Sequence, residues 1–121
     1  MGRESGRLAP PMDALLVFCT CPDDATAERI ARELVARRLA ACVSRGPVRS
    51  VYRWNDGIES AAEVQLVIKT TRPAYDALER ALRGLHPYEL PEILAVEAAA
   101  GLAGYLDWIG ACIPDPSAED A

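Results

Sequence analysis

Long apolar runs, basic side chains and histidine are all scarce in this chain of 121 residues. No apolar run approaches the ~20 residues of a membrane helix, so the sequence predicts a protein without a membrane-spanning helix. Thirteen basic residues against eighteen acidic ones give a net charge of -5. That sign disfavours a protein whose affinity comes from nucleic-acid phosphates. Since no basic-then-apolar leader opens the chain, we expect a cytoplasmic protein.

Cysteine is too sparse for the disulfide framework of a small secreted domain. The four cysteines stand at positions 19, 21, 42 and 112, in otherwise apolar segments. This usage favours reduced thiols in the cytosol. His86 is the only histidine, and repeated Cys-x2-Cys spacing is missing, which argues against a complete structural zinc cage.

Local catalytic motifs are missing as well. No serine lies in a Gly-x-Ser-x-Gly context, and the chain has neither a Walker loop nor Gly-x-Gly-x-x-Gly. A chain of nucleophile, base and orienting group therefore does not emerge from local sequence. The sequence predicts a protein that is not an enzyme.

The length accommodates one domain with a core of normal size. Residues 1–11 are polar with prolines and glycines, and residues 114–121 are acidic around two prolines. Both ends have the composition of disordered tails. We therefore expect a single folded domain at residues 12–113.

Periodicity and turn signals predict the order of elements within that domain. Asp23 or Asp24 can cap the first helix, and Asn55-Asp56-Gly57 is typical of a tight hairpin, which needs positive φ. Pro73 fits the first turn of a second helix, which should end before Pro87. The expected strands cover residues 13–19, 39–44, 48–54, 63–70 and 92–96, where 39–44 and 48–54 form either a strand pair or one bent strand. The expected helices cover about 23–38, 73–85 and 102–113.

The order strand, helix, strand, strand, helix, strand, with an extra terminal helix, predicts an α+β fold. It is the ferredoxin-like split βαβ arrangement (βαββαβ) with an antiparallel sheet. One helical layer covers one face of such a sheet. Ser50, Tyr52 and Trp54 share one side of a long hairpin and need another cover, for which a partner subunit is the natural candidate.

Metal binding is the chemistry best supported by the residues themselves. Cys19 and Cys21 flank the end of the first strand, and a thiolate pair with a nearby imidazole suits a soft ion such as Cu(I). In the predicted topology, the segment after His86 lies beside that strand end. The alternatives stay open: the cysteines could be small core side chains, and His86 could only cap the second helix.

Lys69 is the one lysine among thirteen basic residues. At a strand end beside two threonines, it suggests a place that needs a compact ammonium group; the alternative is a bias in composition. Glu59 and Glu63 flank the hairpin and could face Lys69 or solvent.

Six motifs in order resemble the CutA family of divalent-cation tolerance proteins, and they span about residues 13–113. The motifs are Cys19-Thr20-x-Pro22, Leu39-Ala40-Ala41-Cys42-Val43, Ser50-x-Tyr52-x-Trp54, Glu63 with Ile68-Lys69-Thr70, His86-Pro87-Tyr88-x-x-Pro91-Glu92 and Tyr105-Leu106-x-Trp108-Ile109. The resemblance implies a ferredoxin-like homotrimer, cytoplasmic in bacteria, linked to copper and divalent-metal tolerance. It implies no established catalytic activity and no obligatory cofactor, with copper or another divalent metal ion as the ligand.

The resemblance also implies two sets of site residues. Cys19 and His86 match copper-binding positions of enterobacterial members, which have a His-His pair where this chain has Leu85 and His86; Cys21 could substitute for the missing histidine. The residues that match the family's cleft are Tyr52, Trp54, Glu63, Lys69, Tyr88 and Glu92. The alternative function is a trimeric regulatory or scaffold protein that binds a small ligand or a partner protein at the intersubunit cleft.

Overall fold

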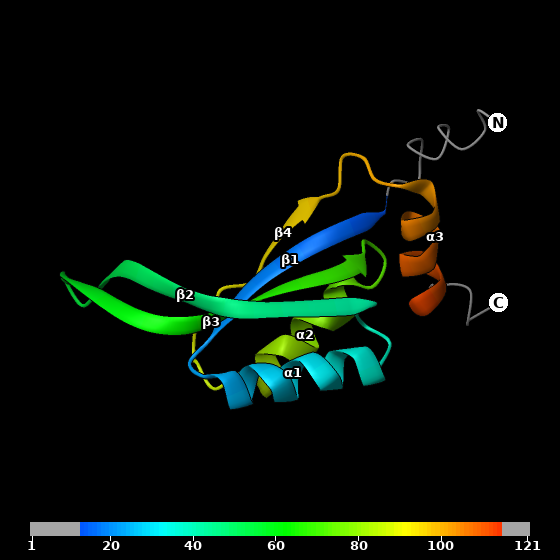
Figure 1. Ribbon diagram of the computed structural model, residues 1–121. Helices are drawn as coiled ribbons and strands as arrows, with labels where there is room; N and C mark the ends of the chain where they lie inside the picture. The colour runs from blue at the N-terminus through cyan, green and yellow to red at the C-terminus, as the bar shows by residue number, and fades with distance from the viewer. Residues whose placement is uncertain (1–12, 115–121) are drawn as a thin grey trace.

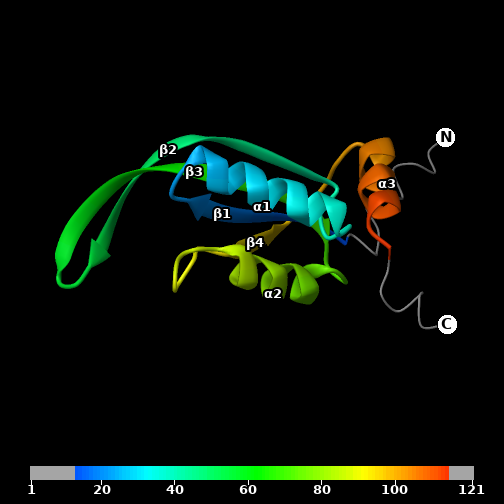
Figure 2. The same ribbon diagram turned by 90° about the horizontal axis from the view of Figure 1, so that it is seen from below.

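The computed structural model describes residues 13–114, so the two predicted tails lie almost entirely outside the described residues. Four strands form one antiparallel sheet in the order β2-β3-β1-β4. Helices α1 and α2 lie side by side on one face of this sheet, and α3 lies at the end opposite the hairpin tip (Figures 1 and 2). The predicted ferredoxin-like α+β fold is confirmed. No helix within residues 13–114 is long and apolar enough to cross a membrane.

Strand β1 (Ala14–Cys21) lies between β3 (Gly57–Thr71) and β4 (Leu94–Glu97). It pairs with β3 along its whole length, from Ala14 with Thr71 to Cys21 with Val64. Strand β4 is shorter and pairs with β1 only as far as Phe18. The last part of β1 therefore has a free edge on the β4 side.

Strand β2 (Cys42–Trp54) is one continuous strand and forms a long hairpin with β3. The tight turn at its tip is the predicted one, but the positive φ falls on Asn55 (51°) and Asp56 (66°). Gly57 instead opens β3, opposite Trp54. A third left-handed residue, Arg38 at φ 60°, lies two residues after the end of the first helix, where the chain turns toward β2.

Helix α1 (Asp24–Ala36) is capped by Asp23, whose side chain accepts a 2.8 Å hydrogen bond from the Thr26 backbone N–H. This settles which aspartate is the cap. Helix α2 (Tyr75–Leu85) begins two residues after Pro73, so the proline precedes the helix and does not lie in its first turn. It ends, as predicted, at His86, whose backbone is extended before Pro87.

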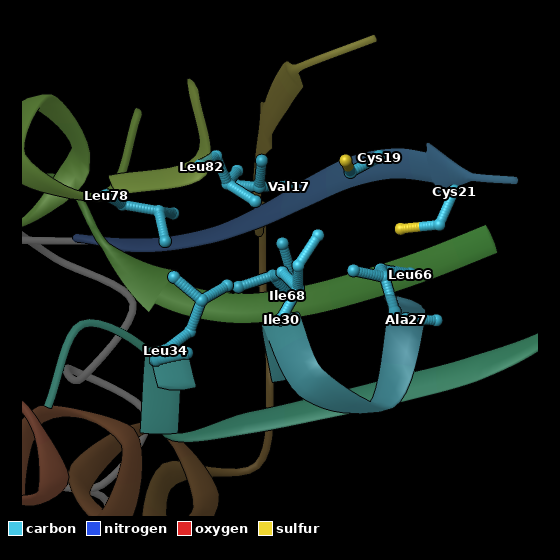
Figure 3. Packing of buried hydrophobic residues seen from close by; sticks show 11 residues of the cluster. Val17, Cys19, Cys21, Ala27, Ile30, Leu34, Leu66, Ile68, Leu78 and Leu82 are labelled. Atoms are coloured by element: carbon cyan, nitrogen blue, oxygen red, sulfur yellow. The ribbon is translucent and has the colours of Figure 1, made fainter. Parts of the chain in front are cut away.

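The core lies between the sheet and these two helices. Its fully buried members include Ile30 and Leu34 from α1, Leu78 and Leu82 from α2, and Leu66 from β3 (Figure 3). Each such side chain contributes about 1.5–3 kcal/mol relative to an exposed one. This layer also fixes how β1 faces the helices.

Helix α3 (Ala103–Cys112) contributes to a second, smaller cluster. Of the apolar side chains at its N-cap and along it, Ile109 is buried and Leu106 half-buried, but Leu102 and Tyr105 are exposed. These apolar side chains are therefore only partly covered within the chain. Large apolar side chains are also exposed on the hairpin (Val51, Tyr52, Trp54, Ile58) and on β4 (Leu94, Val96).

Candidate functional site

Cys19 and Cys21 occupy one face of β1 because the strand continues through Thr20 to Cys21. Alternate residues of a strand share a face, and this face is the one that packs against the helices (Figure 3). Both thiols are fully buried, and neither forms a disulfide. The cysteines are therefore core side chains, which was the alternative to a metal site. The strand also brings them together as a pair.

His86 joins this pair from the end of α2. Its backbone N–H bonds Leu82 O and caps the helix, but its ring does not bond the last carbonyls of α2. The ring lies at the free edge of β1, where Nε2 is 2.7 Å from the Thr20 carbonyl oxygen. The Tyr88 backbone N–H donates to Nδ1 at 3.1 Å. These two partners select the neutral tautomer that carries its proton on Nε2.

The three side chains converge closely enough to share one ion. The ligand atoms of Cys19, Cys21 and His86 all lie within 4.8 Å of one another, and each residue is buried. Two sulfurs on one zinc-sized ion are at most ~4.6 Å apart, given metal–sulfur bonds of ~2.3 Å. The donor set of two sulfurs and one imidazole nitrogen fits a soft ion after small shifts, provided that one ring nitrogen leaves its present partner.

The two thiols differ in acidity. The pKa of Cys19 is raised well above its ordinary value, first by its hydrogen bond to Cys21, then by burial and by nearby negative charge from Cys21, Glu92 and Glu63. The pKa of Cys21 is lowered because it accepts that bond. Cys21 therefore ionises first, and a metal ion that binds both sulfurs must displace the proton of Cys19.

A cavity of about 1010 Å³ lies between the β2–β3 hairpin and the loop that follows His86. Among its lining residues are Tyr52, Trp54, Glu63, Tyr88 and Glu92, which are five of the six cleft residues inferred from the family resemblance. The remaining lining residues are Thr20, Ser50, Val51, Glu89, Leu90 and Pro91.

Two hydrogen bonds join pairs of residues that line this cavity. The Tyr88 hydroxyl donates to Glu63 at 2.7 Å, and the Thr20 hydroxyl makes a long bond of 3.5 Å to Glu92. Burial, followed by the bond to Glu63, raises the pKa of Tyr88 above its usual value. The phenol is therefore neutral and donates to the carboxylate through the physiological range.

Lys69 does not line this cavity. Its ammonium donates to Ser44 at 2.7 Å and lies 3.8 Å from the Cys42 sulfur. Lys69 and Glu63 share a face of β3, but six residues of strand separate them by ~20 Å. Within the described chain, Lys69 therefore belongs to the far end of the sheet, beside a half-buried Cys42.

Sequence reasoning missed Thr20 as a functional position. Its side chain lies on the face of β1 opposite Cys19 and Cys21, where it lines the cavity, while its carbonyl accepts from His86 on the strand edge. The signal that could have identified Thr20 is its position between two candidate ligands, in Cys19-Thr20-Cys21. Glu89, which stands beside Tyr88 in the same loop, also lines the cavity but was not among the expected cleft residues.

Comparison with known proteins agrees with the motifs. The family model described as CutA1 divalent ion tolerance protein matches residues 15–112. The divalent-cation tolerance protein CutA of Pectobacterium atrosepticum is 42% identical over 105 residues, which are 86% of this chain and 96% of that protein. The crystal structure of CutA from Xylella fastidiosa has a TM-score of 0.83 and 48% identity, and it covers 84% of this chain and 99% of its own. The structure titled periplasmic divalent cation tolerance protein CutA, from Archaeoglobus fulgidus, has a TM-score of 0.82 and 33% identity over 84% of this chain and 99% of its own. The chain therefore belongs to the CutA1 family of divalent ion tolerance proteins.

Proposed function

We propose that this protein acts in metal tolerance by binding copper, as Cu(I), through Cys19, Cys21 and His86. The observation that carries the proposal is the convergence of two buried thiols and one imidazole within 4.8 Å, in a member of a divalent ion tolerance family. Thiolate and imidazole ligands suit a soft ion. Cys21 takes the place of the histidine that enterobacterial members have at the position of Leu85.

The proposed activity is binding and not catalysis. The family description names tolerance to ions and no reaction. We place the protein in the cytoplasm, because the site needs reduced thiols and the cytosol keeps them reduced. The Archaeoglobus relative is described as periplasmic, so the assignment rests on the chemistry of this chain's own cysteines.

Copper titration tests the metal site. Competition between the purified protein and a Cu(I) chelator, under anaerobic reducing conditions, gives the affinity. We expect Cys19→Ser and Cys21→Ser each to weaken binding at least tenfold, about 1.4 kcal/mol, because a hydroxyl is a poor ligand for a soft ion. Cys42→Ser is the matched control and should leave the affinity unchanged. Equal affinity for wild type and Cys19→Ser would exclude the site.

We further propose that the functional unit is a homotrimer. Exposed Val51, Tyr52 and Trp54 on the hairpin, and the open β2 and β4 edges, are features that another copy would cover. Light scattering should give about three times the chain mass of 13.1 kDa. A stable monomer at micromolar concentration would contradict the trimer.

A second candidate function is regulation or scaffolding through the cavity. The observation that favours it is the 1010 Å³ volume itself, walled by the hairpin and the loop after His86. Such a space is large enough for a small molecule or for a side chain of a partner. Binding there would not require the thiols.

A further inference from the structure

The His86 ring takes the place of a strand partner on the edge of β1. The Ala98 N–H donates to the Ala14 carbonyl at 3.0 Å, so the even-numbered residues of β1 turn their backbone groups toward β4. Strand β4 pairs with β1 no further than Phe18, which leaves the Thr20 carbonyl beyond its reach. His86 Nε2 donates to this carbonyl at 2.7 Å. The Nε2 side of the ring is therefore anchored to the strand itself.

Tyr88 holds the other side of the ring. Its backbone N–H donates to Nδ1 at 3.1 Å, and its ring centroid is 4.7 Å from the imidazole centroid. Its hydroxyl donates to Glu63 of β3 at 2.7 Å. These contacts are made within one chain, so they do not depend on how much of its surface another copy covers.

The two ring nitrogens are not equivalent as ligands for an ion. A ligand nitrogen needs a free lone pair, and Nε2 carries the proton in the metal-free ring. Binding through Nε2 would move that proton to Nδ1, where it would face the Tyr88 N–H, so both hydrogen bonds of the ring would be lost. Binding through Nδ1 moves no proton and breaks only the longer bond, the one to Tyr88. The second lost bond weakens binding through Nε2 by roughly two- to tenfold relative to Nδ1.

The Thr20 carbonyl already makes the contact that supports a metal-binding histidine. Such a histidine donates its other ring N–H to a carboxylate or a backbone carbonyl, which fixes its tautomer and orientation. We propose that His86 binds the ion through Nδ1, and that the Tyr88 backbone N–H, which occupies this nitrogen in the metal-free protein, is released. The inference rests on the copper site proposed above and names the part of the chain that responds when that site is filled.

The released N–H belongs to the peptide between Pro87 and Tyr88. Proline fixes its own φ but not its ψ, so this peptide can turn while the end of α2 stays in place. That end is held by the His86 backbone N–H, which bonds Leu82 O at 2.9 Å. Because the Tyr88 hydroxyl is bonded to Glu63, a change at Tyr88 also reaches β3.

NMR of the isotope-labelled full chain tests the inference. His86 is the only histidine, so it gives the only imidazole signals. In the metal-free protein we expect the ring proton on Nε2. After equimolar Cu(I) is added under anaerobic reducing conditions, the proton should stay on Nε2 and the Nδ1 signal should shift.

Hydrogen exchange of two backbone amides supplies a matched control. Protection of the Tyr88 N–H should fall at least ~tenfold when copper binds, whereas the His86 N–H, bonded to Leu82 O, should keep its protection in both states. With free Cu(I) buffered near the wild-type Kd, Cys42→Ser should repeat the wild-type result. Cys21→Ser, at the same copper concentration, should lose several times less protection at Tyr88.

The possible failures are distinguishable. A metal-free ring with its proton on Nδ1, transfer of the proton to Nδ1 when copper binds, or a Tyr88 amide that stays protected in the copper-bound protein would each overturn the inference and leave the copper site standing. If copper binds without shifting either ring nitrogen, His86 is not a ligand, and the three-ligand site fails together with the inference. Absence of copper binding overturns both as well.

Discussion

The substitution His86→Leu tests how much the imidazole ring contributes to the stability of the metal-free protein. The ring bonds two backbone groups, the Thr20 carbonyl at 2.7 Å and the Tyr88 N–H at 3.1 Å, and His86 itself is 7% exposed. Leucine fills much of the same space but bonds neither group. Leaving two buried backbone groups without partners costs about 1–3 kcal/mol each when water cannot replace the ring, and less when it can.

We therefore expect His86→Leu to lower the free energy of unfolding by about 2–4 kcal/mol. At roughly 4 °C per kcal/mol for a domain of this size, the melting temperature should fall by about 8–16 °C. Urea unfolding with a chelator present removes the contribution of metal, and one fixed protein concentration allows wild type and variant to be compared under the same conditions of assembly. Glu89→Gln, an exposed change in the same loop, should stay within about 0.5 kcal/mol of wild type. A His86→Leu variant as stable as wild type would refute the structural role of the ring.

Three further outcomes follow from the same geometry. Leu82→Ala, which empties a fully buried position of α2, should cost about 2–5 kcal/mol in urea unfolding. The folded state raises the pKa of Tyr88 above its unfolded value near ~10. Its contribution to stability is thus complete below pH ~10 and lost as pH rises through the folded pKa, so the difference in melting temperature between wild type and Tyr88→Phe should shrink in that alkaline range. Deleting residues 1–11 and 115–121 should change the melting temperature by only a few degrees, with ~1 kcal/mol as the threshold for a real loss.

Local signals predicted the elements well because each is decided by a few neighbouring residues. Helix α1 shows this: Asp23, one of its two candidate caps, caps it, and ion pairs join residues four apart along it, Glu28 with Arg32 and Glu33 with Arg37. The hairpin turn was placed correctly for the same reason. The residues that carry positive φ within the turn were less predictable, because asparagine and aspartate tolerate that region more readily than other non-glycine residues do, so any of the three turn residues could carry it.

The cavity could not be derived from local sequence. Tyr88 meets Glu63 across 25 residues of chain, and only the path of the loop after His86 decides that they touch. Lys69 was grouped with the cleft through the family resemblance. The strand register places it opposite Cys42 and Leu16, at the far end of the sheet from the cavity. Such distances become visible only once the register of the whole sheet is known.

The thiol site and the cavity lie on opposite faces of β1, but two residues connect them. Thr20 and Tyr88 hold the His86 ring through their backbone atoms, and both line the cavity. Under the proposed function, a ring nitrogen that binds copper must release one of these backbone groups, at a cost of about 0.5–1.5 kcal/mol. Because Thr20 and Tyr88 also line the cavity, releasing one of them changes the cavity wall and hence the affinity of a cavity ligand. By linkage, a ligand in the cavity changes the affinity for copper by the same factor. Since 1.4 kcal/mol is tenfold in affinity, a single hydrogen bond is enough to couple the two sites by up to about that factor.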